Sequence, residues 1–316
     1  MEVIRLGYPH HKNKDEMPAT SAALGYFDGV HLGHQKVIGQ ALEIAKQRGF
    51  KSAVMTFHPH PRAVLGQLKQ EVNHITPLDE KINLIGNLGV DYLFLIDFSQ
   101  EFARLNPQEF IDQYIIGLNI AHVTAGFDYT YGRMGKGTME TIPFHSREMF
   151  THATVEKLAK DDEKISSTKI RELISMGLME GAEELLGRPF TTKGTVAHGD
   201  KRGRTIGFPT ANIELKDPYI LPPAGVYAVR IQIQGNWHYG VCNAGYRPTF
   251  KENQPKLSIE VHIFHFNEEI YGEQATVEWH KRLREEKKFS GIDALVAQIS
   301  ADKEQAAAYF GIVSGN

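Results

Sequence analysis

The chain has 316 residues, of which 41% are hydrophobic and 23% charged, so it is long enough for two globular domains with cores of their own. A formal net charge of −3 and a pI near 6.6 provide no basic field for nucleic acid, so a polyanionic substrate would have to be held by local groups. The single cysteine, Cys242, excludes an intramolecular disulfide framework, and the lack of a signal peptide or of about eighteen consecutive apolar residues predicts a cytoplasmic protein without a nucleic-acid or membrane partner.

The first half of the chain alternates short apolar runs with segments of helical periodicity. Apolar residues recur at helical spacing between 35 and 48, whereas 52–57 and 91–98 are typical of strands inside a sheet. Strand–helix–strand units almost always form right-handed crossovers between parallel strands, so we expect a parallel, Rossmann-like α/β sheet. The predicted strands are 2–6, 21–24, 52–57, 91–98, 121–126 and 155–158, and the predicted helices are 35–48, 78–88, 107–117, 169–176 and 180–186.

The stretch 25–34 connects the strand at 21–24 to the first long helix. The carboxyl end of such a strand is a ligand position, because the helix amino terminus presents free N–H groups and a partial positive charge to an anion. His31 and His34 can donate hydrogen bonds to phosphoryl oxygens during in-line displacement, and Gly33 lets the backbone approach closely. The stretch therefore predicts a nucleotide phosphate site, to which we assign Gly25, Phe27, Asp28 and Gly33 as nucleotide-binding residues.

Two other interpretations of this stretch stay open at this point. It could be a surface turn that happens to hold two histidines, or it could supply metal ligands together with His58 and His60. Pro59 and Pro61 forbid a helix at the second histidine pair and place it on a loop at the same edge of the sheet, where loops face ligand.

Hydroxyl side chains precede a later helix. Ser166, Ser167 and Thr168 stand before the helix predicted at 169–176, which is the composition expected of an N-cap. Capping needs only one hydroxyl. Three in a row, followed by Arg171 on the first turn, can also bind triphosphate oxygens, with the guanidinium as a bidentate clamp.

From about residue 188 the pattern changes to closely spaced strands with period-two alternation. We therefore predict an α/β domain at 1–187 and an all-β domain at 188–316. Five or six strands favour a small closed antiparallel β-barrel, because closure removes exposed edges, and an amphipathic terminal helix, with an apolar stripe from Ile292 to Phe310, is expected to lid the barrel. The predicted strands are 191–196, 225–232, 237–243, 257–264 and 275–279.

The segment 193–212 is richer in glycine and in basic residues than an ordinary hairpin. Its glycines leave backbone N–H groups free to wrap phosphates, and its lysine and arginine side chains supply positive charge. A flexible surface loop is the alternative interpretation. The residues that we assign to ATP here are Gly199, Lys201, Gly203, Arg204, Gly207 and Pro209.

Two short motifs carry a resemblance to a known superfamily. His31-Leu32-Gly33-His34 resembles the His-x-Gly-His signature of nucleotidylyltransferases, and the segment 165–171 resembles their second, Ser/Thr-rich signature. From about Leu24 to Phe310 the chain is similar to the bacterial bifunctional riboflavin kinases/FMN adenylyltransferases, also called FAD synthetases. The resemblance implies a nucleotidylyltransferase-type α/β domain followed by a riboflavin kinase barrel.

In the first domain the resemblance singles out two further nucleotide-binding residues. His60 is the histidine that matches the family in its motif, and Asp128, in an aromatic and glycine-rich segment, is implied to lie close to the reacting nucleotide. His58 occupies a position where an acidic residue is common in the family, which leaves its role open.

In the second domain the motif Pro209-Thr210-Ala211-Asn212 is similar to the Pro-Thr-Ala-Asn motif of riboflavin kinases. The similarity implies that Thr210 and Asn212 help to hold Mg²⁺ and the ATP phosphates, with waters and phosphate oxygens completing the octahedron. The segment 243–250 resembles another turn of the family, with Ala244 where isoleucine is usual.

A kinase that phosphorylates an alcohol also needs an acceptor for the proton of the attacking hydroxyl. Alternation along the strand 258–264 puts Glu260 and His262 on the face opposite Ile259 and Val261. Glu260 matches the family's glutamate in this strand and is the expected base. His262 is its rival by geometry.

These residues imply an enzyme with two active sites, one that phosphorylates riboflavin to FMN and one that transfers AMP from ATP to FMN to give FAD. The substrates are ATP, riboflavin and FMN, and Mg²⁺ accompanies ATP. One alternative is a nucleotidylyltransferase with another acceptor and a barrel that only binds flavin. Another is a nucleotide- or RNA-binding regulator without catalysis, against which the intact His31, His34 and Glu260 argue.

Overall fold

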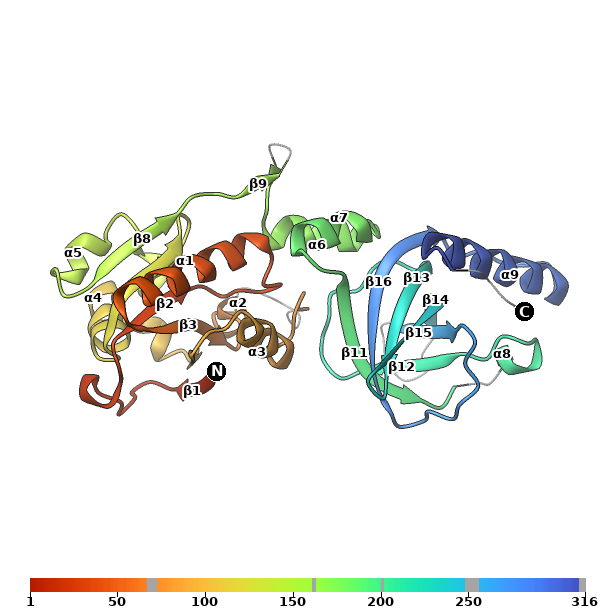
Figure 1. The fold of residues 1–316 in the computed structure, drawn as a ribbon, viewed down its shortest axis with the longest axis horizontal. Helices are drawn as coiled ribbons and strands as arrows, with labels where there is room; N and C mark the ends of the chain where they lie inside the picture. Colours follow the sequence, from red (N-terminus) through yellow and green to blue (C-terminus); the bar gives the residue numbers. More distant parts are fainter. Residues whose placement is uncertain (67–72, 161–162, 200–201, 248–255, 313–316) are drawn as a thin grey trace. The chain divides into compact units, whose positions relative to one another are not determined.

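The computed structural model describes residues 1–66, 73–160, 163–199, 202–247 and 256–312. The contacts of the chain separate two compact units, Met1–Ser167 and Thr168–Asn316, and each is described by itself (Figure 1). The units divide upstream of the boundary predicted at 187/188. As a border between two functions, that boundary stays a prediction.

The first unit is built on a six-stranded sheet in the order β1-β4-β3-β2-β5-β8. Every neighbouring pair of its strands is parallel, which confirms the predicted parallel α/β fold. The strands are β1 (Glu2–Leu6), β2 (Thr20–Leu24), β3 (Lys51–His58), β4 (Tyr92–Asp97), β5 (Ile120–Gly126) and β8 (Thr151–Val155).

Apolar side chains are buried on both faces of this sheet. On one face Ala23 packs in a cluster with Ile38 of the first long helix, and on the other Leu24 packs in a cluster with Phe110 and Tyr114. This two-sided burial explains the near-continuous apolar strands of the sequence. The helices are α1 (Leu32–Arg48), α2 (Pro61–Val64), α3 (Leu78–Asn87), α4 (Pro107–Phe110), a π-helix (Ile111–Ile116) and α5 (Ile142–Ser146).

The strand order reverses direction at β2, which lies between β3 and β5. In open parallel sheets, ligands bind outside the carboxyl ends of the strands at such a switch point, because the connections leave there in opposite directions and open a crevice. The loops that follow β2 and β5 therefore meet at the edge where the sequence places the phosphate site.

Three sequence predictions for the first unit differ from the structure in detail. The strand expected at 155–158 is wrong, because β8 covers Thr151–Val155 and 156–158 lie beyond it. The helix expected at 107–117 is a short α-helix continued by a π-helix. The first long helix begins at Leu32 rather than at 35, because His31 caps it.

The second unit contains a closed antiparallel barrel in the order β11-β12-β15-β14-β13-β16. This confirms the small closed barrel with a terminal helix. The strand β12 was not predicted as an element, because it overlaps the glycine-rich segment that precedes it. The bounds are β11 (Phe190–Ala197), β12 (Ala211–Leu215), β13 (Gly225–Ile233), β14 (Asn236–Arg247), β15 (Lys256–Ile263) and β16 (Gln274–Arg284), with α6 (Ser167–Met176), α7 (Met179–Leu186), α8 (Arg202–Thr205) and α9 (Ile292–Tyr309).

Alternate residues of the barrel strands fill its interior. The Trp279 ring lies 5.2 Å from the Tyr227 ring, centroid to centroid, and its Nε1 donates to Thr192 Oγ1 at 3.0 Å. All three side chains are fully buried, and a buried indole N–H needs such an acceptor. Their neighbours along each strand consequently point to the outer wall.

The terminal helix α9 does not lid the barrel but lies on its outer wall. Ala306 and Ala307 share a cluster with Ala228 and Val241, a cross-strand pair that alternates with the inward-facing residues. The predicted stripe is wrong at its start, because Ile292 is 67% exposed. A bidentate ion pair holds the helix in place: Arg284 Nε and Nη2 donate to the Asp302 carboxylate at 2.8 and 2.7 Å.

The helix α7 packs on the barrel strands β11 and β16, and its Glu180 accepts from Lys281 Nζ at 3.1 Å. We expect a fragment of residues 168–316 to fold and to phosphorylate riboflavin alone, whereas a fragment of 188–316 should unfold roughly 10 °C lower, because it loses the burial of Met179, Ala182 and Leu186. Thermal unfolding and FMN formation by the two fragments measure this. Equal melting temperatures would contradict the stabilising role of α7.

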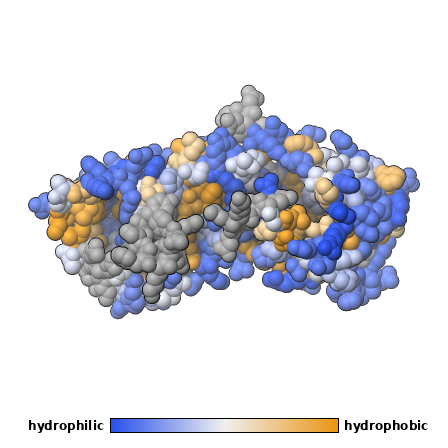
Figure 2. Space-filling model, turned by 180° about the vertical axis from the view of Figure 1, so that it is seen from behind, coloured by the Kyte–Doolittle hydropathy of each residue, from blue (hydrophilic) through white to orange (hydrophobic). Residues whose placement is uncertain are grey.

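Figure 2 shows one face of the molecule, which is mostly hydrophilic with apolar residues in small separate patches. Met134 and Phe144, at 84% and 79% exposed, are the most exposed large apolar side chains of the described residues. Over the described ranges, no helix combines the length and the apolar character needed to cross a membrane.

Candidate active sites

The loop after β2 folds tightly because several of its residues adopt positive φ angles. Phe27, Gly29 and Val30 have φ of 56°, 88° and 41°. The Phe27 ring folds back under Gly25, where a Cβ would lie 2.7 Å from ring atom Cζ, so glycine is required there. Two non-glycine residues in the left-handed region indicate a backbone that its surroundings must hold in place.

His31 is the N-cap of α1. Its Nδ1 accepts from the backbone N–H of His34 at 3.2 Å, so the neutral ring carries its proton on Nε2. The two imidazoles stack with centroids 3.5 Å apart and planes 19° apart. Gly33 lies against this pair, since a Cβ there would be 3.1 Å from His31 Cε1. The structure thus brings the predicted catalytic histidines together at the start of one helix.

The environment of His34 keeps it uncharged at neutral pH. Burial, the neighbouring His31 and the ammonium of Lys81 lower the pKa of His34 well below its usual value. The Phe27 ring lies 5.3 Å from it, edge-on. Among the described residues, His34 Nδ1 is a buried nitrogen without a hydrogen-bond partner. His34 can therefore offer a neutral N–H group to an anion.

Asp28 holds the loop through its own hydrogen bonds. Its carboxylate accepts from the backbone N–H groups of Ile75 and Thr76 at 3.4 and 3.1 Å, and its carbonyl accepts from Ser167 Oγ at 2.9 Å. The residue is 5% exposed. This geometry gives Asp28 a positional role, and a direct contact with nucleotide stays a prediction.

The second histidine pair lies at the carboxyl end of β3. His60 caps α2, its Nδ1 accepting from the N–H of Arg62 at 3.0 Å, and its ring lies 4.3 Å from the Tyr26 ring. Burial lowers the pKa of His58. In the ranges that the structure covers, no three His, Cys, Asp or Glu side chains are placed to hold a metal ion.

Asp128 follows β5 at the same edge and is exposed. Its carboxylate forms an ion pair with Lys164 Nζ, and this ammonium also lies 4.8 Å from the centroid of the Phe127 ring. The Phe127 N–H donates to the carbonyl of Val155 at 3.2 Å, which joins the ends of β5 and β8. We call residues 25–31, between β2 and α1, the histidine loop. A charged and aromatic surface therefore borders this loop on the β5 side.

The hydroxyl motif is split by the start of α6. The helix begins at Ser167, not at 169, so only Ser166 precedes it. Ser167 is engaged with the carbonyl of Asp28. Thr168 and Arg171 belong to the second compact unit, and their assignment to triphosphate stays a prediction.

In the barrel the glycine-rich segment packs tightly around the Pro209–Asn212 motif. A Cβ on Gly199 would lie 2.1 Å from Asn212 Nδ2, and one on Gly203 would lie 2.3 Å from the carbonyl of Phe208. These positions admit only glycine, since any side chain would displace the motif. Gly207 has a φ of 87°. Arg204 lies in α8, whereas Lys201 lies outside the described residues, as do 248–250 of the second turn.

Three polar residues form a row across the outer wall of the barrel. Asn212 of β12 is the register partner of Glu260 of β15, which in turn pairs with Asn243 of β14. Directly opposed residues in antiparallel strands have Cβ atoms about 5 Å apart. The structure thus brings Asn212 and Glu260 together, and it adds Asn243, which was noted only as part of a motif.

His262 lies on the same wall and contacts the motif. Its Nδ1 donates to the carbonyl of Pro209 at 2.9 Å, and burial lowers its pKa. The ring is edge-on to Phe208 at 5.4 Å. This bond connects His262 to the turn that carries Thr210 and Asn212. The choice between Glu260 and His262 as the acceptor of the hydroxyl proton stays a prediction.

The variant His262→Phe should raise the KM for ATP and lower riboflavin phosphorylation by about tenfold, because the Pro209 carbonyl loses its donor while the ring volume is kept. Steady-state kinetics with varied ATP measure this. His238→Ala, on β14, is the matched control. A loss of ~10²–10⁴-fold in kcat with KM unchanged would instead identify His262 as the base.

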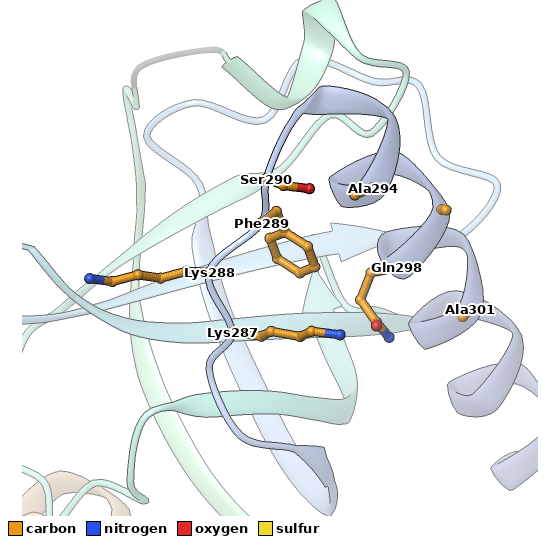
Figure 3. Close-up of a pocket in the computed structure, with 8 residues that line it drawn as sticks. Lys287, Lys288, Phe289, Ser290, Ala294, Gln298 and Ala301 are labelled. Carbon is orange, nitrogen blue, oxygen red and sulfur yellow. The ribbon is translucent and has the colours of Figure 1, made fainter.

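A groove of about 340 Å³ lies between the segment before α9 and the helix itself (Figure 3). Phe289 and Gln298 lie between the two walls, and Lys288 extends away from the helix. The segment passes beside β14, because a Cβ on Gly245 would lie 2.6 Å from Glu286 Oε1. Sequence reasoning missed this groove; the available signal was a single aromatic residue, Phe289, directly after the charged run 284–288.

Comparisons with known proteins indicate two activities in this chain. The sequence model described as FAD synthetase matches residues 13–169, and the one described as riboflavin kinase matches 186–310. The chain is 54% identical over 311 residues, 98% of both chains, to the bifunctional riboflavin kinase/FMN adenylyltransferase of Bacillus subtilis (strain 168). It is 49% identical over 288 residues, 91% of both chains, to the protein of the same name from Listeria monocytogenes.

A solved structure titled as a macrolide-efflux protein from Streptococcus pneumoniae has a TM-score of 0.85 to this chain at 37% identity, covering 96% of this chain and 97% of the other. It confirms the fold. We do not assign the efflux function in that title to this chain, because the relatives of higher identity are named bifunctional riboflavin kinase/FMN adenylyltransferase. The two family matches favour the bifunctional enzyme over a transferase with another acceptor or a regulator without catalysis. The chain therefore belongs to the bifunctional riboflavin kinase/FMN adenylyltransferase family, which makes FMN from riboflavin and FAD from FMN.

Proposed function

We propose that the first unit carries FMN adenylylation and that His31 and His34 are its catalytic residues. The observation that carries this assignment is the stacked histidine pair at the amino terminus of α1, at the switch point of a parallel sheet. A phosphate oxygen of FMN attacks the α-phosphorus of ATP, and pyrophosphate leaves in line. The α-phosphoryl oxygens gain charge in this step and are stabilised by donors already in place.

The histidines have complementary roles in this proposal. His31 donates from Nε2, because its Nδ1 is occupied by the N–H of His34. The lowered pKa of His34 keeps it a neutral donor and avoids two positive charges in stacked rings. No side chain becomes covalently attached. The loop residues Gly25, Phe27, Asp28 and Gly33, together with His60, Asp128, Ser166, Ser167, Thr168 and Arg171, are proposed to hold or frame the nucleotide.

We propose that the barrel phosphorylates riboflavin on its outer wall. The primary hydroxyl of riboflavin attacks the γ-phosphorus of ATP, Glu260 accepts the hydroxyl proton, and ADP leaves. The support for this role is that Glu260 lies opposite Asn212 in the strand register, and Asn212 belongs to the motif packed against Gly199. Gly203, Arg204, Gly207 and Pro209, with Lys201, are proposed to surround the phosphates.

The donor set of the motif fits Mg²⁺. Thr210 and Asn212 offer neutral oxygens, and a cation held by two such ligands keeps coordination positions for water and phosphate oxygens. When bound, Mg²⁺ neutralises charge on the ATP phosphates. The tight packing of Gly199 on the Asn212 amide fixes the orientation of this side chain.

The groove beside α9 is the proposed place for the flavin ring. Phe289 supplies an aromatic face, and Ala294 and Ala301 supply a flat wall on the helix. Glu286, which directly precedes the lining residue Lys287, contacts β14 at Gly245, two residues beyond Asn243. A flavin ring in the groove would then direct its hydroxylated chain toward Glu260.

Incubation of the purified protein with riboflavin, ATP and Mg²⁺, followed by chromatographic separation of the flavins, tests both activities. FMN and FAD together support the two-site proposal. FMN alone would remove adenylylation from the first unit, and the lack of both products would overturn the proposal.

A further inference from the structure

A buried lysine lies directly beneath the histidine loop. Lys81 of α3 is 2% exposed, and lysine is almost never buried to this extent without a partner. Its Nζ donates to the carbonyl of Tyr26 at 3.0 Å and to Thr56 Oγ1 at 3.3 Å. The ammonium also lies 4.3 Å from the centroid of the Tyr26 ring. Neither the sequence motifs nor the mechanism above uses this residue.

The two acceptors of Lys81 are themselves connected. Thr56 Oγ1 donates to the same Tyr26 carbonyl at 2.8 Å, so this one oxygen accepts from β3 and from α3 at once. Tyr26 precedes Phe27, the first residue of the loop with a positive φ. Fixing the Tyr26 carbonyl fixes the peptide plane from which the strained turn starts, and His31 follows at its end.

We propose that Lys81 is a positioning residue for FMN adenylylation, whose buried ammonium ties Tyr26 to Thr56 and so holds the loop that carries His31 and His34. The inference rests on the proposed role of the two histidines. A strained loop that carries catalytic groups must be held by its surroundings, and misplacement by about 1 Å can cost up to 100-fold in rate.

The charge of Lys81 has a second consequence. The carboxylate of Asp28 in the loop acts on the ammonium of Lys81, and the ammonium in turn acts on His34 of α1 and His58 of β3. Burial lowers the pKa of Lys81 to about 8, so it is positively charged at neutral pH. A nearby positive charge disfavours protonation of imidazole, and loss of the Lys81 charge should therefore raise the pKa of His34.

The test compares Lys81→Met, Lys81→Gln and the exposed control Lys46→Met in the full-length protein. Lys81→Met removes both hydrogen bonds and should lower the kcat/KM of FMN adenylylation by about 10- to 100-fold, with riboflavin phosphorylation unchanged as an internal control. Lys81→Gln restores a donor without a charge and should recover part of the rate. In both, NMR titration should show a higher pKa for His34, a shift that a purely structural role would not produce.

Adenylylation by Lys81→Met within about threefold of the wild type, with an unshifted His34, would overturn the inference. Loss of adenylylation in His31 and His34 variants of the same preparation would leave the proposed function standing; retention there would remove the proposed function as well. If Lys81→Met does not fold, Thr56→Val tests the inference instead. This variant deletes the Thr56 hydroxyl, which accepts from the Lys81 ammonium and donates to the Tyr26 carbonyl. A wild-type rate in Thr56→Val would then overturn the inference.

Discussion

The double variant His31→Ala/His34→Ala is expected to lose FMN adenylylation by roughly 10³-fold or more, while riboflavin phosphorylation continues. The reason is that both imidazoles stack at the start of α1, where they can donate to the α-phosphoryl group. Chromatography of the flavins should show FMN accumulating without FAD. The second activity of the same molecule reports whether the protein is folded.

Two further variants sharpen this test. His31→Ala also removes the cap of α1, which costs about 0.5–2 kcal/mol, whereas asparagine is a good N-cap. His31→Asn therefore keeps the helix start and removes only the imidazole. His11→Ala/His152→Ala is the matched control for the loss of two histidines. A fall in kinase turnover in a folded double variant would show that the pair serves more than one site.

The parts of the fold that could be predicted are those that depend on local sequence patterns. Apolar runs with turn signals located the strands, and the break near 188 separated α/β from all-β. The two histidines could be placed at the carboxyl end of a strand from the sequence, and the structure brings them together there; their chemistry stays a prediction. The contact between the Pro209–Asn212 motif and the strand that carries Glu260 could not be predicted from local patterns. It depends on the pairing register of β12 and β15, in which Asn212 lies opposite Glu260.

Residues that act through distant partners were missed for the same reason. Lys81 is one lysine in an amphipathic helix, and its acceptors belong to Tyr26 and Thr56, on other elements of the chain. The face of α9 was misjudged because the pattern marks apolar positions but not what covers them. In the structure the small residues Ala306 and Ala307 form the buried contact, and of the predicted stripe Phe310 packs beside them.

Asp28 shows that neighbouring residues of one motif can have different structural roles. The sequence grouped it with nucleotide-binding residues, yet its carboxylate holds the backbone of Ile75 and Thr76. With Ser167 on its carbonyl and Lys81 on that of Tyr26, the loop is fixed from three sides. The two histidines are thus presented by a frame of hydrogen bonds that the linear motif does not contain.

Glu260→Gln is expected to show the converse of the histidine variants, losing FMN formation while supplied FMN is still converted to FAD. The change keeps the size of the side chain but removes its ability to accept the hydroxyl proton, and loss of a positioned base commonly costs ~10²–10⁴-fold in kcat. Initial rates with riboflavin and with FMN as separate substrates measure the two activities in one preparation.

Glu214→Gln is the matched control for Glu260→Gln, because Glu214 lies on β12, two residues beyond Asn212 on the same outer face of the barrel. It should leave both activities unchanged. Near-native kinase turnover in Glu260→Gln would pass the role of base to His262 or to water. The combination with His262→Phe separates these two, since only a histidine base would make the double variant inactive, whereas catalysis through water would persist at the rate set by the loosened Pro209 turn.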